Sequence, residues 1–162
     1  KTLFLPQLLM SAEAAKAAFE VVKAAMASET EEKQGKVVLA TVKGDIHDIG
    51  KNIVKVLLEN YGFEVVDLGK DVAPEKIVEA AAAPGVKLVG LSALMTTTVV
   101  SMEETIKALR ESGSGVKVVV GGAVLTEEYA AGIGADCYAR DAMATVRYAG
   151  KVYGAENGEE KA

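Results

Sequence analysis

The sequence predicts an α/β fold in which helices cover both faces of a five-stranded, doubly wound parallel sheet. Three observations lead to this prediction. From about residue 35 onward, short β-branched apolar runs alternate with helical stretches. The runs are apolar almost throughout, which is typical of strands buried on both faces. The chain has 162 residues, close to the size of one domain, and half of them are apolar.

A long amphipathic helix is predicted first, over residues 6–27. Apolar side chains recur there with the i, i+3, i+4 spacing of one helix face, and Pro6 is tolerated in the first turn. The polar run 28–35 has no apolar face and ends in glycine, so we interpret it as a solvated linker. Residues 1–34 are therefore expected to form a helix and linker ahead of the α/β domain.

Five strands and five helices are predicted to alternate along residues 35–154. The expected strands cover residues 37–42, 63–68, 88–91, 116–120 and 135–138. The expected helices cover residues 49–60, 75–83, 99–111, 126–131 and 141–153. Strands separated by helices of this length pair in parallel. The charged, glycine-containing tail, residues 155–162, is expected to fray.

Composition and charge exclude several classes of function. One histidine and one cysteine cannot supply a multi-ligand zinc cluster or a disulfide framework. A net charge of −5, without a run of lysine or arginine, offers no surface for a nucleic acid. No apolar stretch reaches the roughly 20 residues that span a bilayer, and no signal-peptide cleavage site is present, so we expect a cytoplasmic protein without a membrane partner. Because the chain starts at Lys1 and is apolar from the outset, we also expect a fragment.

The loop after the first predicted strand carries the only histidine. In a doubly wound sheet, ligands bind beyond the carboxyl ends of the strands, where this loop lies. Gly44 and Gly50 bracket it, and Asp45 precedes His47 by two residues. A carboxylate at that spacing can fix one imidazole nitrogen, either of a metal ligand or of a general base. A third interpretation is a surface histidine, with Asp48 as the helix N-cap and Gly50 for close packing.

Other motifs that carry chemistry are not found. The sequence has no Gly-x-Ser-x-Gly elbow, Gly-x-Gly-x-x-Gly fingerprint or Walker A loop. Cys137 lies in or just after the last predicted strand, and no second histidine is present to activate it. Hydrolysis and binding of nucleotide phosphates are therefore disfavoured.

Three short motifs follow successive predicted strands. They are Asp45-x-His47-x-x-Gly50, Ser92-x-Leu94 and Gly121-Gly122. Together and in this order they resemble the signature of the cobalamin-binding domain of vitamin B12-dependent methyltransferases. Residues 40–54 and the N-terminal Phe4-Leu5-Pro6-Gln7-Leu8-Leu9 are also similar to cobalamin-dependent methionine synthase and to the small corrinoid proteins of methylamine, methanol and aryl-ether demethylation.

The resemblance implies catalytic roles for three residues. His47 corresponds to the histidine that replaces the cofactor's own dimethylbenzimidazole as the lower axial ligand of cobalt. Asp45 corresponds to the aspartate hydrogen-bonded to that histidine. Thr98 stands where methionine synthase has a serine that completes the relay, although Thr98 can equally start or cap the following helix.

The resemblance also implies a set of contacts with cobalamin. Ser92 and Leu94 are expected to line a slot for the displaced nucleotide tail, and Gly121 and Gly122 to let backbone approach it, although a glycine pair also suits an ordinary turn. Tyr138 either contacts the tail or is a packed aromatic. The expected cofactor-binding set is Leu5, Leu8, Leu9, Gly44, Asp45, Ile46, His47, Asp48, Gly50, Ser92, Leu94, Thr96, Gly121, Gly122 and Ala142.

The predicted N-terminal helix resembles the last helix of the helical cap that covers the corrin in this family. Leu5, Leu8 and Leu9 correspond to positions near the methyl group. Most of the cap has no counterpart in this sequence, so we expect either self-association through the apolar stripe or trimming from a longer protein.

The function implied is that of a module whose cobalt carries a methyl group from a donor to a thiol acceptor. Our first expectation is a part of cobalamin-dependent methionine synthase, with homocysteine as acceptor. The alternatives are a stand-alone corrinoid protein of a methylamine, methanol or aryl-ether system, a B12-sensing regulator, and an adenosylcobalamin mutase. The mutases share the Asp-x-His-x-x-Gly pattern, but residues 4–7 and 94–98 of this sequence resemble the methyltransferases instead. A flavodoxin-like domain with an unrelated ligand is the remaining alternative. A methyl-carrying module is not catalytic alone and needs partners that supply donor, acceptor and reductive activation.

Overall fold

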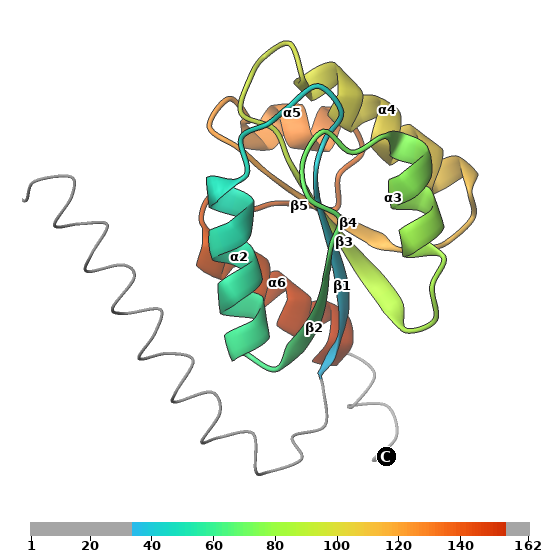
Figure 1. The fold of residues 1–162 in the computed structure, drawn as a ribbon, viewed down its shortest axis with the longest axis vertical. Coiled ribbons are helices and arrows are strands. Elements are labelled where there is room, and N and C mark those ends of the chain that lie inside the picture. The colour runs from blue at the N-terminus through green and yellow to red at the C-terminus, as the bar shows by residue number, and fades with distance from the viewer. Residues whose placement is uncertain (1–33, 155–162) are drawn as a thin grey trace, which may run out of the picture. The chain divides into compact units, whose positions relative to one another are not determined.

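The computed structural model describes residues 34–154, which lie within one of the two units into which the chain divides, Lys33–Ala162. The predicted N-terminal helix with Leu5, Leu8 and Leu9, and the tail 155–162, lie outside the described residues. The described residues form one parallel sheet of order β2-β1-β3-β4-β5 with helices between the strands (Figure 1). This is the flavodoxin-like order, so the predicted doubly wound fold is confirmed.

All five predicted strands are present, and no strand end differs from its predicted position by more than two residues. They are β1 (Gly35–Thr41), β2 (Phe63–Asp67), β3 (Val86–Ser92), β4 (Lys117–Gly121) and β5 (Cys137–Tyr138). Every pairing is parallel. Val42, predicted as the last residue of the first strand, instead forms an isolated bridge to Val72 beyond the end of the sheet.

The five predicted helices are also present. They are α2 (Ile49–Asn60), α3 (Pro74–Ala81), α4 (Val99–Glu111), α5 (Glu127–Gly132) and α6 (Ala142–Gly154). Two of them, α2 and α4, begin and end at the predicted residues. No helix among residues 34–154 is long and apolar enough to cross a membrane.

The two faces of the sheet are filled unequally. Helices α2 and α6 cover one face, and α3, α4 and α5 cover the other (Figure 1). Among the described residues, the core under α3, α4 and α5 contains 19 buried apolar residues, whereas the core under α2 and α6 contains 10. The difference reflects a cavity that lies on the α2 and α6 side.

Candidate functional site

The loop between β1 and α2 places a buried carboxylate beside the histidine. The side chain of Asp45 is fully buried, whereas that of His47 is 44% exposed. Asp45 Oδ1 accepts hydrogen bonds from the backbone N–H of His47 at 2.9 Å and from His47 Nδ1 at 2.8 Å. The two-residue spacing therefore produces the pairing that it predicted.

The other carboxylate oxygen is bonded to the loop between β3 and α4. Asp45 Oδ2 accepts from the backbone N–H of Leu94 at 2.7 Å and from the hydroxyl of Thr98 at 2.7 Å. Thr98 Oγ1 also lies 2.9 Å from the carbonyl oxygen of Met95. Thr98 precedes α4, but its side chain makes no capping hydrogen bond. Thr98 thus makes the hydrogen bond to Asp45 that is expected of a relay residue, and helix capping does not account for its side chain.

These hydrogen bonds determine the charge of Asp45. Burial by itself raises the pKa of the carboxyl group, but the bonds from Thr98, from the amides of His47 and Leu94, and from the imidazole outweigh it, so the pKa lies well below its ordinary range. An ionised carboxylate can only accept, so a neutral imidazole at His47 carries its proton on Nδ1 and keeps a lone pair on Nε2. Among residues 34–154, Nε2 has no hydrogen-bond partner, as a metal-binding nitrogen requires.

We predict that Asp45→Asn lowers the free energy of unfolding by about 3 kcal/mol near neutral pH, because an amide cannot accept all these bonds. The folded-state pKa of Asp45 is lower than that of the unfolded chain, so its contribution is fully present above the unfolded pKa of about 3.9 and declines as the pH falls below it. Urea unfolding of both proteins at about pH 7, 5 and 3 tests this. The difference in free energy of unfolding between wild type and Asp45→Asn should be equal at pH 7 and 5 and smaller at pH 3. An equal difference at pH 3 would contradict the prediction.

An ion pair between Lys51 and Asp67 fixes the start of α2. Lys51 is buried, and its Nζ donates to Asp67 Oδ1 at 2.5 Å and to Asn52 Oδ1 at 3.0 Å. Burial raises the pKa of Asp67, but the bonds from Lys51 and from the amide of Gly69 outweigh it and lower the pKa overall. The contact ties the first turn of α2 to the end of β2, and the histidine loop leads directly into that turn.

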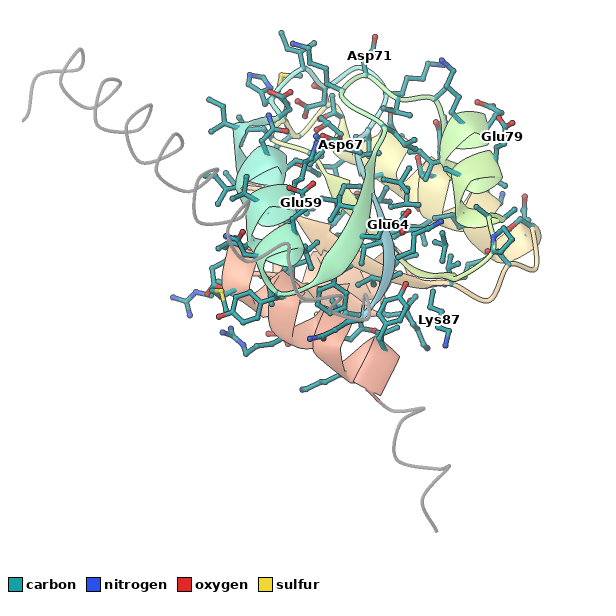
Figure 2. All side chains as sticks on the ribbon, turned by 60° about the horizontal axis from the view of Figure 1, so that its bottom comes forward. Glu59, Glu64, Asp67, Asp71, Glu79 and Lys87 are labelled. Carbon is teal, nitrogen blue, oxygen red and sulfur yellow. The ribbon has the colours of Figure 1, made fainter. Side chains whose placement is uncertain are left out.

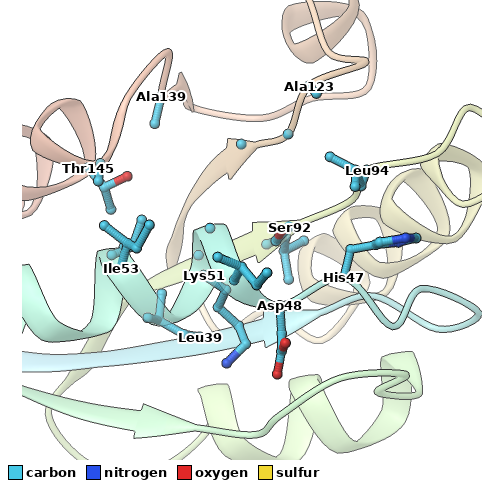
Figure 3. Close-up of a pocket in the computed structure, with 18 of the residues that line it drawn as sticks. Leu39, His47, Asp48, Lys51, Ile53, Ser92, Leu94, Ala123, Ala139 and Thr145 are labelled. Atoms are coloured by element: carbon cyan, nitrogen blue, oxygen red, sulfur yellow. The ribbon is translucent and has the colours of Figure 1, made fainter. Parts of the chain in front are cut away.

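A cavity of about 660 Å³ opens beside His47, between the sheet and helices α2 and α6. Figure 3 shows Leu39 from β1, Ile53 from α2 and Thr145 from α6 around it, with His47 on the loop at its mouth. The predicted residues that line it are Ile46, His47, Asp48, Gly50, Ser92, Leu94, Gly121, Gly122 and Ala142. Tyr138 lines it as well while it packs against the core under α3 and α4.

Four predicted residues do not line the cavity. Asp45 and Thr98 are buried and support the histidine through the bonds described above. Gly44 has a φ of +82° and turns the chain just before Asp45. Thr96 is exposed in the loop between β3 and α4. Contacts of Gly44 and Thr96 with a cofactor therefore stay predictions.

The glycines of the motifs serve different purposes. A Cβ on Gly50 would have no atom within 4 Å, so a side chain there would enter open space at the cavity, and close packing does not explain this glycine. A Cβ on Gly121 would meet only the carbonyl oxygen of Ala139, at 3.5 Å. A Cβ on Gly122 would lie 1.8 Å from the carbonyl oxygen of Ala93. The chain's own backbone at Ala93 therefore requires a glycine at position 122, and the contact of Gly122 with a cofactor stays a prediction.

Sequence reasoning missed the floor of the cavity. Gly90, in the middle of β3, and Val119, in β4, both line it, and so does Arg140 after β5. A Cβ on Gly90 would lie 2.5 Å from Leu39 Cδ2. The sequence did contain a signal for Gly90. It lies two residues before Ser92 and so on the same face of the strand, and a glycine inside an apolar strand often marks a close approach of another group.

The donor groups at the site suit one kind of metal. Among the described residues, no group of three or more histidine, cysteine, aspartate or glutamate side chains could hold a metal ion. The site offers one carboxylate-oriented imidazole beside a cavity. Such a site fits a metal that arrives with its other ligands already in place.

Comparisons with known proteins agree with this arrangement. A family model described as the B12 binding domain matches residues 35–147. Dimethylamine corrinoid protein 1 of Methanosarcina mazei is 48% identical over 147 residues, which cover 89% of this chain and 68% of that protein. The structure of the Methanosarcina barkeri monomethylamine corrinoid protein has a TM-score of 0.70 and 38% identity, covering 93% of this chain and 72% of that chain.

A third match comes from the methanol:cobalamin methyltransferase complex MtaBC of Methanosarcina barkeri. It has a TM-score of 0.75 and 33% identity, covering 94% of this chain and 58% of that chain. The family match spans the histidine loop, all the residues that line the cavity and all five strands of the sheet. The chain therefore belongs to the B12-binding domain family, and its cofactor is cobalamin.

Proposed function

We propose that the chain is the cobalamin-carrying protein of a methylated-amine methyltransferase system, with dimethylamine as the first candidate donor. The observation that carries the cofactor role is the histidine held by Asp45, with Nε2 unpartnered, at the mouth of the cavity. The donor class is supported by seven relatives of 44–48% identity that are named dimethylamine corrinoid proteins. These relatives favour the stand-alone alternative and give no support to methionine synthase.

The residues of the chain provide the lower face of the site. Bound cobalamin supplies a cobalt centre that accepts a methyl group from one partner and gives it to another. His47 Nε2 is the nitrogen available to bind the metal, and Asp45 holds the imidazole in the tautomer that leaves this nitrogen unprotonated. Thr98 fixes Asp45 through its hydroxyl.

The lining of the cavity would suit the nucleotide tail of cobalamin. It is lined by apolar side chains such as Leu39, Ile53 and Val119, and Ser92 adds a hydroxyl at the end of β3. A largely apolar lining with a few polar groups suits a heterocyclic base with its attached ribose. We infer that the nucleotide tail of cobalamin occupies this cavity.

We predict that Gly50→Phe weakens the binding of hydroxocobalamin at least tenfold, or ~1.4 kcal/mol, because the ring would occupy the cavity. Equilibrium dialysis with detection by cobalamin absorbance measures this. Gly150→Phe is the matched control, since a Cβ at that α6 position also meets no atom within 4 Å but Gly150 does not line the cavity. Equal binding by the two variants would contradict the placement of the tail.

The donor is tested with the chain loaded with cobalamin and reduced. Separate reactions contain monomethylamine, dimethylamine or methanol, each with a methyltransferase specific for it, or methyltetrahydrofolate with the donor domain of methionine synthase. We expect rapid loss of the reduced-cobalamin absorbance in the dimethylamine reaction. Methylation only by methyltetrahydrofolate would overturn the proposal and restore the methionine synthase interpretation.

A further inference from the structure

The loop between β2 and α3 binds the main chain of the histidine loop through one residue, Asp71. Asp71 Oδ1 accepts a hydrogen bond from the backbone N–H of Gly44 at 2.7 Å. The backbone N–H of Asp71 donates to the carbonyl oxygen of Asp45 at 3.0 Å. Figure 2 shows Asp71 at the end of the domain that lies away from Lys87, which marks the start of β3. Asp71 therefore contacts Gly44 and Asp45, which precede Ile46 and His47 in the histidine loop.

Neighbouring contacts align the two loops along their length. The backbone N–H of Thr41 donates to the carbonyl oxygen of Gly69 at 2.9 Å, and the N–H of Val72 donates to the carbonyl oxygen of Thr41 at 3.1 Å. Val42 and Val72 form a parallel bridge. The pairing of β1 is thus continued past the sheet by the β2–α3 loop, up to the point where Asp71 contacts Gly44.

The backbone of Asp71 is unusual. Its φ is +53°, and it is the one non-glycine residue with positive φ among residues 34–154. Aspartate and asparagine adopt this left-handed conformation more readily than most residues, but it is still unfavourable. The conformation brings both the N–H and the carboxylate of one residue to the histidine loop.

The position of His47 depends on that of Asp45. All the hydrogen bonds found for the His47 backbone N–H and imidazole among the described residues go to the Asp45 carboxylate. Leu94 and Thr98 donate hydrogen bonds to this carboxylate. Asp71, in contrast, contacts the main chain: its N–H donates to the carbonyl oxygen of Asp45, and its carboxylate accepts from the N–H of Gly44. Holding both the side chain and the main chain of Asp45 determines the direction in which the loop presents the imidazole.

We propose that Asp71 is a positioning residue for the cobalt ligand: it holds the backbone of Gly44 and Asp45 so that His47 Nε2 is presented to the metal. This inference rests on the proposed role of His47 as ligand. Asp71 lies 24 positions after His47 and outside all three sequence motifs. The inference is that Asp71 helps to set the fraction of molecules in which His47 is bound to cobalt.

Three variants separate this role from general loosening of the loop. Asp71→Gly removes the carboxylate and accepts the positive φ. Asp71→Asn keeps an acceptor oxygen and tolerates the conformation, so it should restore wild-type behaviour. Lys70→Gly is the matched control, because Lys70 is exposed in the same loop and its replacement removes neither contact of Asp71. Asp71 is also exposed, so none of these changes leaves a hole in the core.

The single histidine makes the measurement specific. The untagged chain is labelled with ¹⁵N-histidine, loaded with cobalamin and reduced to the Co(II) state, and electron paramagnetic resonance gives the fraction with ¹⁵N coupling. We expect Asp71→Gly to lower this fraction at least threefold relative to wild type, with Asp71→Asn and Lys70→Gly unchanged. In the cofactor-free protein, nitrogen NMR of the same label should show faster exchange of the Nδ1 proton in Asp71→Gly only.

The outcomes distinguish this inference from the proposed function. A wild-type chain without ¹⁵N coupling would overturn the proposed function and the inference with it. Clear coupling in wild type that is equal in Asp71→Gly would overturn the inference alone, and so would an equal loss in Lys70→Gly. If Asp71→Gly does not unfold cooperatively in urea, Asp71→Glu replaces it. That variant keeps the charge but displaces the acceptor oxygen, and the fraction with coupling should again fall.

Discussion

Replacement of His47 by alanine is expected to remove the nitrogen coupling from the Co(II) spectrum and to lower methyl transfer at least about 100-fold. The variant should still bind cobalamin, because the cavity proposed for the nucleotide tail is lined mainly by residues of β1, β3, β4, α2 and α6. The lost imidazole is the proposed metal ligand, and changes even to the partners of metal ligands typically cost about 10–100-fold. Transfer from the methylated donor is measured by absorbance with the cofactor-loaded chain.

The control for this experiment is Lys43→Ala. Lys43 is exposed, precedes the same loop and does not line the cavity. It should transfer methyl groups at the wild-type rate. If His47→Ala transfers methyl groups as fast as Lys43→Ala, His47 is not the ligand.

The largest effect on stability is expected for Gly122→Ala, which should lower the free energy of unfolding by at least about 3 kcal/mol. The new Cβ would lie 1.8 Å from the carbonyl oxygen of Ala93 and 2.9 Å from its carbonyl carbon, and the φ of Gly122 is +152°. Ala93 cannot easily move, because it is fully buried and its N–H donates to the carbonyl oxygen of Gly121 at 3.2 Å. Urea unfolding, followed by circular dichroism, measures the change.

Gly121→Ala provides the comparison from the adjacent position. Its Cβ would make one ordinary contact, 3.5 Å from the carbonyl oxygen of Ala139, so a change of less than about 0.5 kcal/mol is expected. Similar losses in both variants would show that the contact with Ala93 is not what requires glycine at position 122.

The elements that the sequence predicted best have strong local signals. Helix α2 begins just after the polar loop around His47, and α4 begins at an apolar-periodic run, so both were predicted to the residue. The fifth strand was predicted over 135–138 but contains only Cys137 and Tyr138. There, the Asp136 carboxylate accepts the N–H of Val118 at 2.8 Å in place of a backbone carbonyl, which a propensity pattern does not reveal.

In the site too, contacts with a local sequence signal could be predicted, whereas contacts made by the backbone or by distant loops could not. The pairing of Asp45 with His47 follows from a spacing of two residues, and the resemblance to a known family pointed to Thr98. The amide of Leu94 could not be predicted as a donor to Asp45, because a backbone N–H has no residue-specific signal. Asp71 was missed because its contact with Gly44 joins residues 27 apart that only the folded sheet brings together. Contacts made by backbone and by distant loops thus escape a single sequence.

The unequal filling of the two faces of the sheet affects how the cofactor-free chain unfolds locally. The half under α3, α4 and α5 has a complete apolar core without any ligand, whereas the half under α2 and α6 encloses the cavity. Local opening of the empty chain should therefore begin with α2 and α6, and a cofactor that binds only the folded form opposes it. The empty chain should therefore be cleaved by a protease faster than the chain loaded with cobalamin.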